Sequence, residues 1–326
     1  MRRTIKEQQA ANSRGSILLG ILLMLVLAVL GASIMAFYDP SSWMIGGIGA
    51  GVLGFVLALI AWSAGSSIVL GISGAREANR IEDQVLDNVV EEMAIAAGIP
   101  KPKIYVIDDS SPNAFATGSG PQNGVVCVTT GLIGKLTREE LQGVIAHEIG
   151  HIRNLDIKFM TTIALVAGAI PMIADIFLRT AWWSGGSRRS RDNDNSVGNV
   201  LAILSIVFAV LAPIFAVLIK LAVSRKREYL ADATAAELTR NPDGLASALI
   251  KISNDPDPLD RANRATEHMY IVDPFKKNMR SYVGDPTQMM NLDSEGPALL
   301  STHPPIADRV RALRGLMGQR QRPDIA

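Results

Sequence analysis

The chain has 326 residues, of which 48% are hydrophobic and only 19% are charged, and its mean hydropathy is +0.22. Soluble domains usually carry about 25% charged residues, so this composition predicts membrane-spanning segments. A net charge of +1 excludes the strongly basic character of typical nucleic-acid-binding proteins, and we expect no nucleic-acid partner. The single cysteine, Cys127, cannot form an internal disulfide. It lies in an apolar run and is expected to be buried, in a part of the chain that faces a reducing compartment.

Two uncharged apolar stretches, 15–38 and 40–75, follow a basic tail at 1–14 that is expected to be cytoplasmic. Each exceeds the about 20 residues that cross the hydrocarbon core. A cleaved signal peptide is the alternative for the first stretch, but that stretch is longer than the usual apolar region of about 7 to 15 residues. Lys and Arg flank the pair and are absent from its connection. The positive-inside rule therefore predicts a transmembrane hairpin over 15–75, with the second helix at about 43–72 and both outer ends in the cytoplasm. The Gly-rich start of the second helix suits close helix packing.

The segment 76–156 is more polar and predicts mixed secondary structure. An amphipathic helix is expected over 76–98, and alternating apolar residues predict strands at 103–107 and 124–129. The apolar face of that helix consists of Ile81, Val85, Val89 and Met93. The stretch 113–118 is either a short edge strand or a plain turn.

A His-Glu-x-x-His motif occupies residues 147–151, in a helix that is expected over 137–156 and begins with a capping-box sequence. Because a helix has 3.6 residues per turn, His147 and His151 share one face and can bind one metal ion. Glu148 can take a proton from a water held by that metal, which is what zinc-dependent peptide hydrolysis requires. A structural role for this face is the alternative. It is weakened because two of the chain's four histidines lie in the motif.

Two further apolar segments follow the motif and are expected to form a second hairpin over 157–223. The first, at about 159–181, contains Asp175 and Arg179 and is marginal as a span, whereas the second, at about 197–220, has the length and composition of one. If residues on both sides of the pair form one site, both segments cross the membrane or neither does. A monotopic or core-buried pair is the alternative, because arginines in the connection weaken the case for exporting it.

The remaining residues, 224–326, are expected to form the second half of the same domain, closed by an Arg-rich helix over 304–317. A catalytic zinc needs three protein ligands and one open position, so a Glu, His or Asp must come from elsewhere in the chain. Glu228 is the best candidate, and Asp232, one turn further on, can accept a hydrogen bond from a ligand imidazole. Taken alone, a glutamate after Arg-Lys-Arg is more often solvated surface. The histidine motif reverses that preference.

Four motifs together resemble the HtpX-like membrane proteases of the M48 metallopeptidases. In chain order they are Asn113-Ala114-Phe115-Ala116-x-Gly118, His147-Glu148-x-x-His151, Glu228-x-x-x-Asp232, and Ser301-Thr302-His303-Pro304-Pro305 with Arg309. The resemblance covers nearly the whole chain, including two apolar segments before the catalytic part and two between the second and third motifs. The stretch 254–300, which contains His268, matches only loosely and receives no role.

The resemblance implies a gluzincin-like integral membrane zinc endopeptidase that is mainly helical, with a small β-sheet and four transmembrane helices. It implies one Zn2+ per chain, bound by His147, His151 and Glu228, with Glu148 as the general base. It also implies that His303 stabilises the oxyanion, with Arg309 supporting the same region.

A strand over 113–118 would bind a substrate beside this centre through main-chain hydrogen bonds, with contacts from Asn113, Ala114, Phe115 and Ala116. The resemblance further implies a multi-pass protein of the cytoplasmic membrane whose catalytic domain faces the cytoplasm. Its substrates would be misfolded or damaged membrane proteins, in quality control and stress response. Polypeptides and the lipid bilayer are the expected partners, and a homo-oligomer is left open.

Three other functions remain as alternatives. An intramembrane zinc protease is disfavoured because charged residues flank the motif on both sides, so the motif helix is amphipathic. A prenyl-protein processing enzyme of the M48 group would share the motifs, but such enzymes are usually larger, with more apolar spans. A non-catalytic membrane scaffold is disfavoured by the intact Glu148, and a protease assay with and without a chelator distinguishes it.

Overall fold

The computed structural model describes residues 5–184, 196–263, 266–275 and 304–320. The chain divides into two compact units. The mixed unit comprises residues 1–13, 64–161 and 223–326, and it contains every strand in the described part of the chain. The helical unit comprises residues 14–63 and 162–222.

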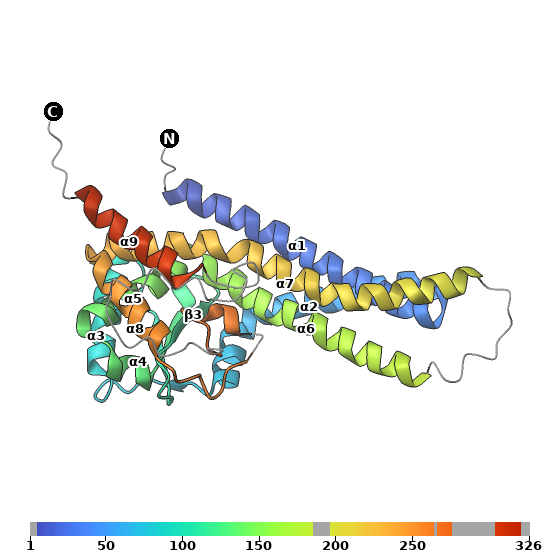
Figure 1. Ribbon diagram of the computed structural model, residues 1–326, viewed down its shortest axis with the longest axis horizontal. Coiled ribbons are helices and arrows are strands. Elements are labelled where there is room, and N and C mark those ends of the chain that lie inside the picture. The colour runs from blue at the N-terminus through green and yellow to red at the C-terminus, as the bar shows by residue number, and fades with distance from the viewer. Residues whose placement is uncertain (1–4, 185–195, 264–265, 276–303, 321–326) are drawn as a thin grey trace. The chain divides into compact units, whose positions relative to one another are not determined.

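Four helices among the described residues are long and apolar enough to cross a membrane. They are α1 (Ile5–Tyr38), α2 (Trp43–Ser73), α6 (Asp156–Ser184) and α7 (Ser196–Thr239), with apolar parts at 17–38, 40–73, 156–183 and 199–219. Most of the other elements are short helices around one small sheet (Figure 1). The predicted class, an integral membrane protein that is mainly helical with a small β-sheet, is confirmed.

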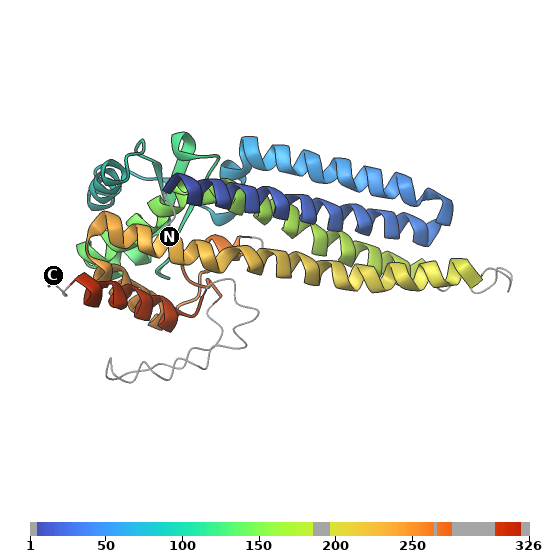
Figure 2. The ribbon, with the colours of Figure 1, turned by 90° about the horizontal axis from the view of Figure 1, so that it is seen from above.

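The helical unit has its own apolar core, to which α1, α6 and α7 contribute. Its buried residues include Leu23, Leu27 and Leu30 of α1, Val166, Ile170 and Phe177 of α6, and Ala209, Ala212 and Ala216 of α7. α1 and α2 form a hairpin (Figure 2), in which Gly46 lies so close to Gly31 that a Cβ atom would overlap the opposite main chain. The expected close packing of the Gly-rich segment is thus present at Gly46, whereas Gly49 and Gly51 face open space.

The mixed unit is built on a four-stranded sheet in the order β1-β2-β4-β3. The strands are β1 (Arg76–Glu77), β2 (Lys103–Ile107), β3 (Ala114–Gly118) and β4 (Gly124–Thr129). β2 and β4 are parallel, and the two outer strands are antiparallel to their neighbours. The two predicted strands are confirmed, and residues 114–118 form an edge strand rather than a plain turn.

The helices of this unit are α3 (Gln84–Ala97), α4 (Thr130–Lys135), α5 (Arg138–Arg153), α8 (Pro242–Asn254) and α9 (Ile306–Arg320). α5 is central, because it packs against α3, α8, β3 and β4. Its capping box is confirmed: the Thr137 hydroxyl accepts from the Glu140 N–H at 3.3 Å, and the Glu140 carboxylate accepts from the Thr137 N–H at 2.8 Å.

The helix predicted over 76–98 is wrong at its start, because α3 begins at Gln84. Residues 76–77 pair with β2 instead, and the Asp83 carboxylate accepts a hydrogen bond from the N–H of Asn79 at 2.9 Å. Such local hydrogen bonds compete with helix formation. The predicted apolar face divides accordingly, since Val89 and Met93 are buried while Ile81 and Val85 are 86% and 54% exposed.

The motif helix was predicted to continue through Asp156, and this is also wrong. α5 ends at Arg153, and Leu155 adopts a left-handed conformation with φ of 63°, so that Asp156 begins a new helix. A non-glycine residue costs about 1–2 kcal/mol in this conformation. The amide of Asn154 donates to the Thr234 hydroxyl of α7 at 3.3 Å, which anchors the turn.

Candidate metal centre

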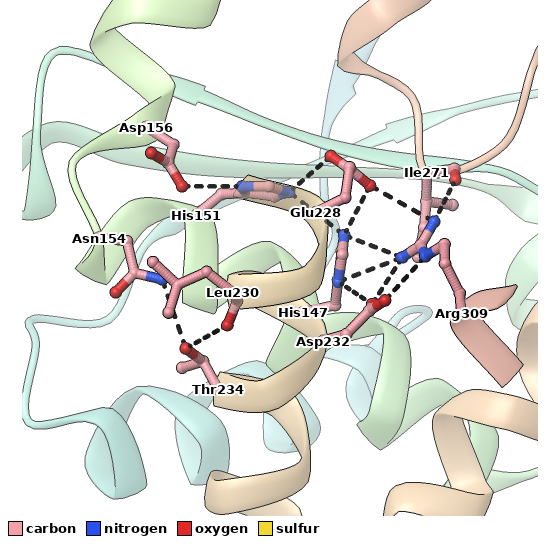
Figure 3. A network of polar contacts seen from close by, with 10 residues as sticks. All are labelled: His147, His151, Asn154, Asp156, Glu228, Leu230, Asp232, Thr234, Ile271 and Arg309. Atoms are coloured by element: carbon pink, nitrogen blue, oxygen red, sulfur yellow. Dashed lines mark hydrogen bonds and ion pairs between the residues drawn. The ribbon is translucent and has the colours of Figure 1, made fainter. Parts of the chain in front are cut away.

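His147 and His151 lie on one face of α5, as their spacing predicts, with their Nε2 atoms 3.2 Å apart (Figure 3). Glu228 comes from α7, and its carboxylate oxygens lie 3.4 Å from Nε2 of His151 and 3.7 Å from Nε2 of His147. All three side chains are buried. With metal bonds of about 2.0–2.2 Å, the ligand atoms of a tetrahedral zinc site lie about 3.3–3.6 Å apart. The three residues therefore fit Zn2+ in both spacing and donor type.

A glycine sets how closely α7 approaches α5 at this point. A Cβ atom on Gly150 would lie 3.3 Å from Thr234 and 3.4 Å from Ala231, both on α7. A Cβ at this position would make a tight contact that α7 could accommodate only by shifting a few tenths of an ångström, so the two helices pack closely at Gly150. Gly150 precedes His151 and Ala231 lies one turn from Glu228, so this close contact lies beside the imidazole and the carboxylate.

Asp232 and Arg309 surround His147. Oδ1 of Asp232 lies 2.9 Å from Nδ1 of His147, so the carboxylate can accept that N–H and leave Nε2 for a metal. Arg309, on α9, donates to both oxygens of Asp232 at 2.9 and 2.7 Å, and it lies 3.4 Å from the Glu228 carboxylate. Burial lowers the pKa of His147, which favours the neutral imidazole that a metal needs. Burial alone would raise the pKa of Asp232, but Arg309 and the hydrogen bond with His147 hold it below its usual value.

Asp156 is a neighbour of His151 that the sequence interpretation missed. Its Oδ2 lies 3.3 Å from Nδ1 of His151, and its Oδ1 lies 3.2 Å from the Arg227 guanidinium. The guanidinium also lies 4.4 Å from the centre of the Phe159 ring. Asp156 reaches His151 because the chain turns at 154–155, so the spacing of residues on a regular helix could not predict this contact. The available signal was a carboxylate at the start of an apolar segment, where buried charge is costly.

The surroundings of His151 favour positive charge. Burial by itself lowers its pKa, but the carboxylates of Asp156 and Glu228 raise it to about 10. The same two carboxylates would stabilise a bound divalent cation. The electrostatics of the site thus agree with its spacing.

Glu148 is 1% exposed and faces the edge strand of the sheet. The main-chain N–H of Ala116 in β3 donates to its carboxylate. Oε2 of Glu148 accepts no hydrogen bond from any described residue. Burial raises the pKa of Glu148 to about 8, and nearby Glu228 acts in the same direction. A basic carboxylate with one available oxygen suits proton transfer.

The outer edge of β3 is partly covered by residues 270–272. The N–H of Ile271 donates to the carbonyl of Ala114 at 2.9 Å, and Tyr270 packs edge-to-face on Phe115. Just before the strand, the side-chain amide of Asn113 donates to the carbonyl of Val272 at 3.0 Å, and its oxygen accepts from the N–H of Val272 at 3.5 Å. Arg309 donates to the carbonyl of Ile271 at 3.1 Å. Ala116–Gly118 is the part of the edge beyond these contacts, and it includes the residue that bonds to Glu148.

The predicted site residues within the described part of the chain all belong to the mixed unit. Those gathered around the histidine pair are Glu148, Glu228, Asp232 and Arg309. Asn113, Ala114 and Phe115 contact 270–272, as described above. The predicted oxyanion residue, His303, lies outside the described residues.

Comparison with known proteins places this centre in a family. The model of peptidase family M48 matches residues 80–317. The chain is 43% identical over 316 residues to a protease HtpX homolog of Caldanaerobacter subterraneus subsp. tengcongensis, covering 97% of this chain and 99% of the relative. It is 44% identical to the homolog of Dictyoglomus thermophilum, covering 97% and 96%, and 40% identical to that of Listeria monocytogenes, covering 95% and 99%.

Among solved structures, the crystal structure of S. mikatae Ste24p is similar with a TM-score of 0.48 and 22% identity. That match covers 88% of this chain and 62% of the Ste24p chain. The histidine pair and the four carboxylates around it, Glu148, Asp156, Glu228 and Asp232, lie within the residues that the family model matches. The chain therefore belongs to peptidase family M48, as an HtpX-like membrane metalloprotease.

Proposed function

We propose that the chain is a zinc endopeptidase in which His147, His151 and Glu228 bind one Zn2+ per chain. The observation that carries this proposal is the spacing of three buried side chains from two helices that are far apart in sequence: the two Nε2 atoms lie 3.2 Å apart, and the Glu228 oxygens lie 3.4 and 3.7 Å from them. The buried Glu148 on the same helix supplies a base next to the edge strand.

When bound, Zn2+ would supply a Lewis acid that acidifies a water and polarises the scissile carbonyl. Glu148 takes a proton from the attacking water and passes it to the leaving amine. Asp232, held by Arg309, keeps the proton of His147 on Nδ1, so that Nε2 can act as a ligand. His303 is assigned to the oxyanion, where a hydrogen-bond donor would stabilise the developing charge.

The substrate main chain would add to the outer edge of β3. Because successive residues of a strand direct their main-chain groups to opposite sides, Ala116 and Gly118 face the same side as Ala114. The carbonyl of Ala114 already accepts from Ile271. The proposed contact residues Asn113, Ala114 and Phe115 therefore shape one end of the substrate site. The carbonyl of Ala116 and the main-chain groups of Gly118 are offered to the substrate, because the N–H of Ala116 donates to Glu148.

The proposed organisation is a metallopeptidase domain formed by 76–156 and 224–326, with transmembrane hairpins at 15–75 and 157–223. Basic residues at 1–14 and at 225–227 support a cytoplasmic location for this domain at the cytoplasmic membrane. Misfolded or damaged membrane proteins are the proposed substrates, in quality control and the stress response, because a site attached to membrane helices meets chains that leave the bilayer.

The decisive experiment replaces the base while keeping the metal. The full-length Glu148→Gln variant, purified in detergent, should bind one zinc per chain and lose cleavage of an unfolded model polypeptide. Glu139→Gln is the matched control, because Glu139 lies on the same helix and is exposed. Cleavage retained by Glu148→Gln would refute the role of the base. Absence of bound zinc in the unmodified protein, or cleavage that persists with a chelator, would refute the metal.

Topology has a separate test. Reporter fusions at Ser187, in the connection of the second hairpin, and after Ala326 should report opposite sides of the membrane. Identical sides would show that the second pair of apolar segments does not form a spanning hairpin.

A further inference from the structure

We propose that Asp156 and Arg227 are positioning residues for zinc binding: Asp156 fixes the His151 imidazole, and Arg227 holds Asp156 in place. This inference rests on the proposed metal centre. It assigns a second carboxylate to a site for which sequence motifs pointed only to Asp232.

The main chain is bent to bring Asp156 to His151. On a continuous helix, residues five apart would point about 140° away from each other, at 3.6 residues per turn. The left-handed Leu155 interrupts the helix and returns the next carboxylate to Nδ1 of His151. The amide of Asn154 is bonded to Thr234 of α7, so the turn is anchored to the same helix that carries Glu228 (Figure 3). A non-glycine residue in this conformation is typical of sites where geometry serves a function.

The carboxylate of Asp156 contacts a different group with each oxygen. Oδ2 faces Nδ1 of His151 at 3.3 Å, and Oδ1 faces the Arg227 guanidinium at 3.2 Å. Asp156 is completely buried and Arg227 is 6% exposed. A buried carboxylate is costly without a charged partner, so Arg227 offsets the loss of hydration. The guanidinium also lies over the Phe159 ring, 4.4 Å from its centre, where a cation–π contact stabilises it.

The contacts from Arg227 to Asp156 and from Asp156 to His151 define which nitrogen of His151 faces the other two proposed ligands. An acceptor at Nδ1 keeps the proton there and leaves the lone pair of Nε2 directed at His147 and Glu228. The alternative is that the ion pair between Asp156 and Arg227 only stabilises the packing of α6 against α7. That role predicts lower thermal stability with unchanged zinc affinity, so the two roles can be separated.

The test measures zinc dissociation constants of the full-length protein in detergent, by competition with a chromophoric chelator. All variants carry Glu148→Gln, so that proteolysis cannot alter the sample, and the parent must bind one zinc per chain. Asp156→Asn should weaken zinc binding about 10- to 100-fold, the usual effect of losing a carboxylate behind a ligand histidine. Arg227→Gln should weaken it in the same direction, and Arg227→Lys should recover part of the loss because it restores the charge.

The double variant Asp156→Asn with Arg227→Gln should lose no more affinity than Asp156→Asn alone, because Arg227 acts through Asp156. Glu237→Gln, an exposed carboxylate on the same helix α7, is the matched control and should bind zinc like the parent. The absorption spectrum of the Co2+-substituted protein should change in Asp156→Asn and stay unchanged in the control.

Zinc affinities of Asp156→Asn and Arg227→Gln within twofold of the parent would overturn the proposal, as would an additive double variant. If Asp156→Asn does not fold, Arg227→Gln and Arg227→Lys make the same comparison. A parent that binds no zinc would instead refute the proposed metal centre itself, which keeps the two failures distinct.

Discussion

Each of the two histidines of the proposed metal centre contacts a carboxylate that an arginine holds, but the two sets of contacts are built differently. His147 contacts Asp232, which Arg309 holds with two hydrogen bonds. His151 contacts Asp156, which forms an ion pair with Arg227. We call these two sets the His147 arm and the His151 arm.

The arms differ in geometry and in origin. Arg309 contacts Asp232 through both carboxylate oxygens, whereas Arg227 contacts Asp156 at one oxygen and stacks on Phe159. The His147 arm uses a carboxylate one turn from a ligand on a regular helix. The His151 arm depends on a break in the chain. The difference shows that equivalent chemistry can come from regular spacing in one place and from an irregular turn in another.

The largest effect is expected for Glu228, the proposed ligand that lies beside both histidines. Glu228→Ala should weaken zinc binding by more than about 100-fold, beyond the range for a residue behind a ligand. Metal content after dialysis of the full-length protein measures this, with Glu237→Gln as the control on the same helix. A folded Glu228→Ala protein that keeps one zinc per chain would show that the carboxylate is not a ligand.

The two arginines should differ in their effect on stability. Arg309→Met leaves the buried Asp232 and Glu228 without their cation, and removing one partner of such a group costs about 3–5 kcal/mol. Arg227→Met should cost less, because Arg227 contacts Asp156 at one carboxylate oxygen, whereas Arg309 contacts both oxygens of Asp232 and also Glu228. Thermal unfolding in detergent compares them. Equal midpoints for the two variants would contradict the distinction between the arms.

Substitutions of Leu155, in the turn of the His151 arm, should change the stability by a smaller amount, with a sign that depends on the new residue. Leu155→Gly removes about 1–2 kcal/mol of left-handed strain and adds about 0.5–1 kcal/mol of chain entropy cost. Stability should therefore rise by about 0 to 1.5 kcal/mol, with zinc affinity unchanged. Leu155→Ile should lower the unfolding midpoint, since a branched side chain fits this conformation poorly. Unfolding midpoints and zinc affinities of the two variants check the prediction, and a loss of zinc binding in Leu155→Gly would count against it.

The smallest effect concerns Cys127. Its rate of labelling reports how often the mixed unit opens when an arginine of either arm is replaced. Burial raises the pKa of its thiol far above the ordinary value, and Glu148 adds to the shift, so the thiol stays protonated at pH 8. A thiolate-specific reagent should label it only when the unit opens. Labelling should stay slow in Arg227→Gln and become faster in Arg309→Met. Fast labelling of the unmodified protein would contradict the burial.

Regular spacing explains why much of the site could be predicted from sequence. The shared face of His147 and His151, and the turn from Glu228 to Asp232, follow from helical periodicity alone. The capping box at Thr137 and the strands at 103–107 and 124–129 are also local patterns. Composition and the length of apolar runs sufficed for the membrane class.

Other features depend on contacts between residues far apart in the chain. Helix α3 starts at Gln84 and not at residue 76, because residues 76–77 pair with β2. No local sequence pattern predicts that pairing. The edge of β3 is covered at Ala114 by Ile271, which lies over 150 residues further along the chain. These contacts form only when the sheet and helices have packed.

The membrane class, the proposed ligand pair of α5 and the carboxylates of α7 could be predicted from the sequence, because charge, hydropathy and helical periodicity are properties of short segments. The tertiary structure alone decided that α5 ends at Arg153, that Asp156 returns to His151, and that Arg227 meets it. The physical reason is that a left-handed turn is unfavourable locally and persists because packing against α7 stabilises it.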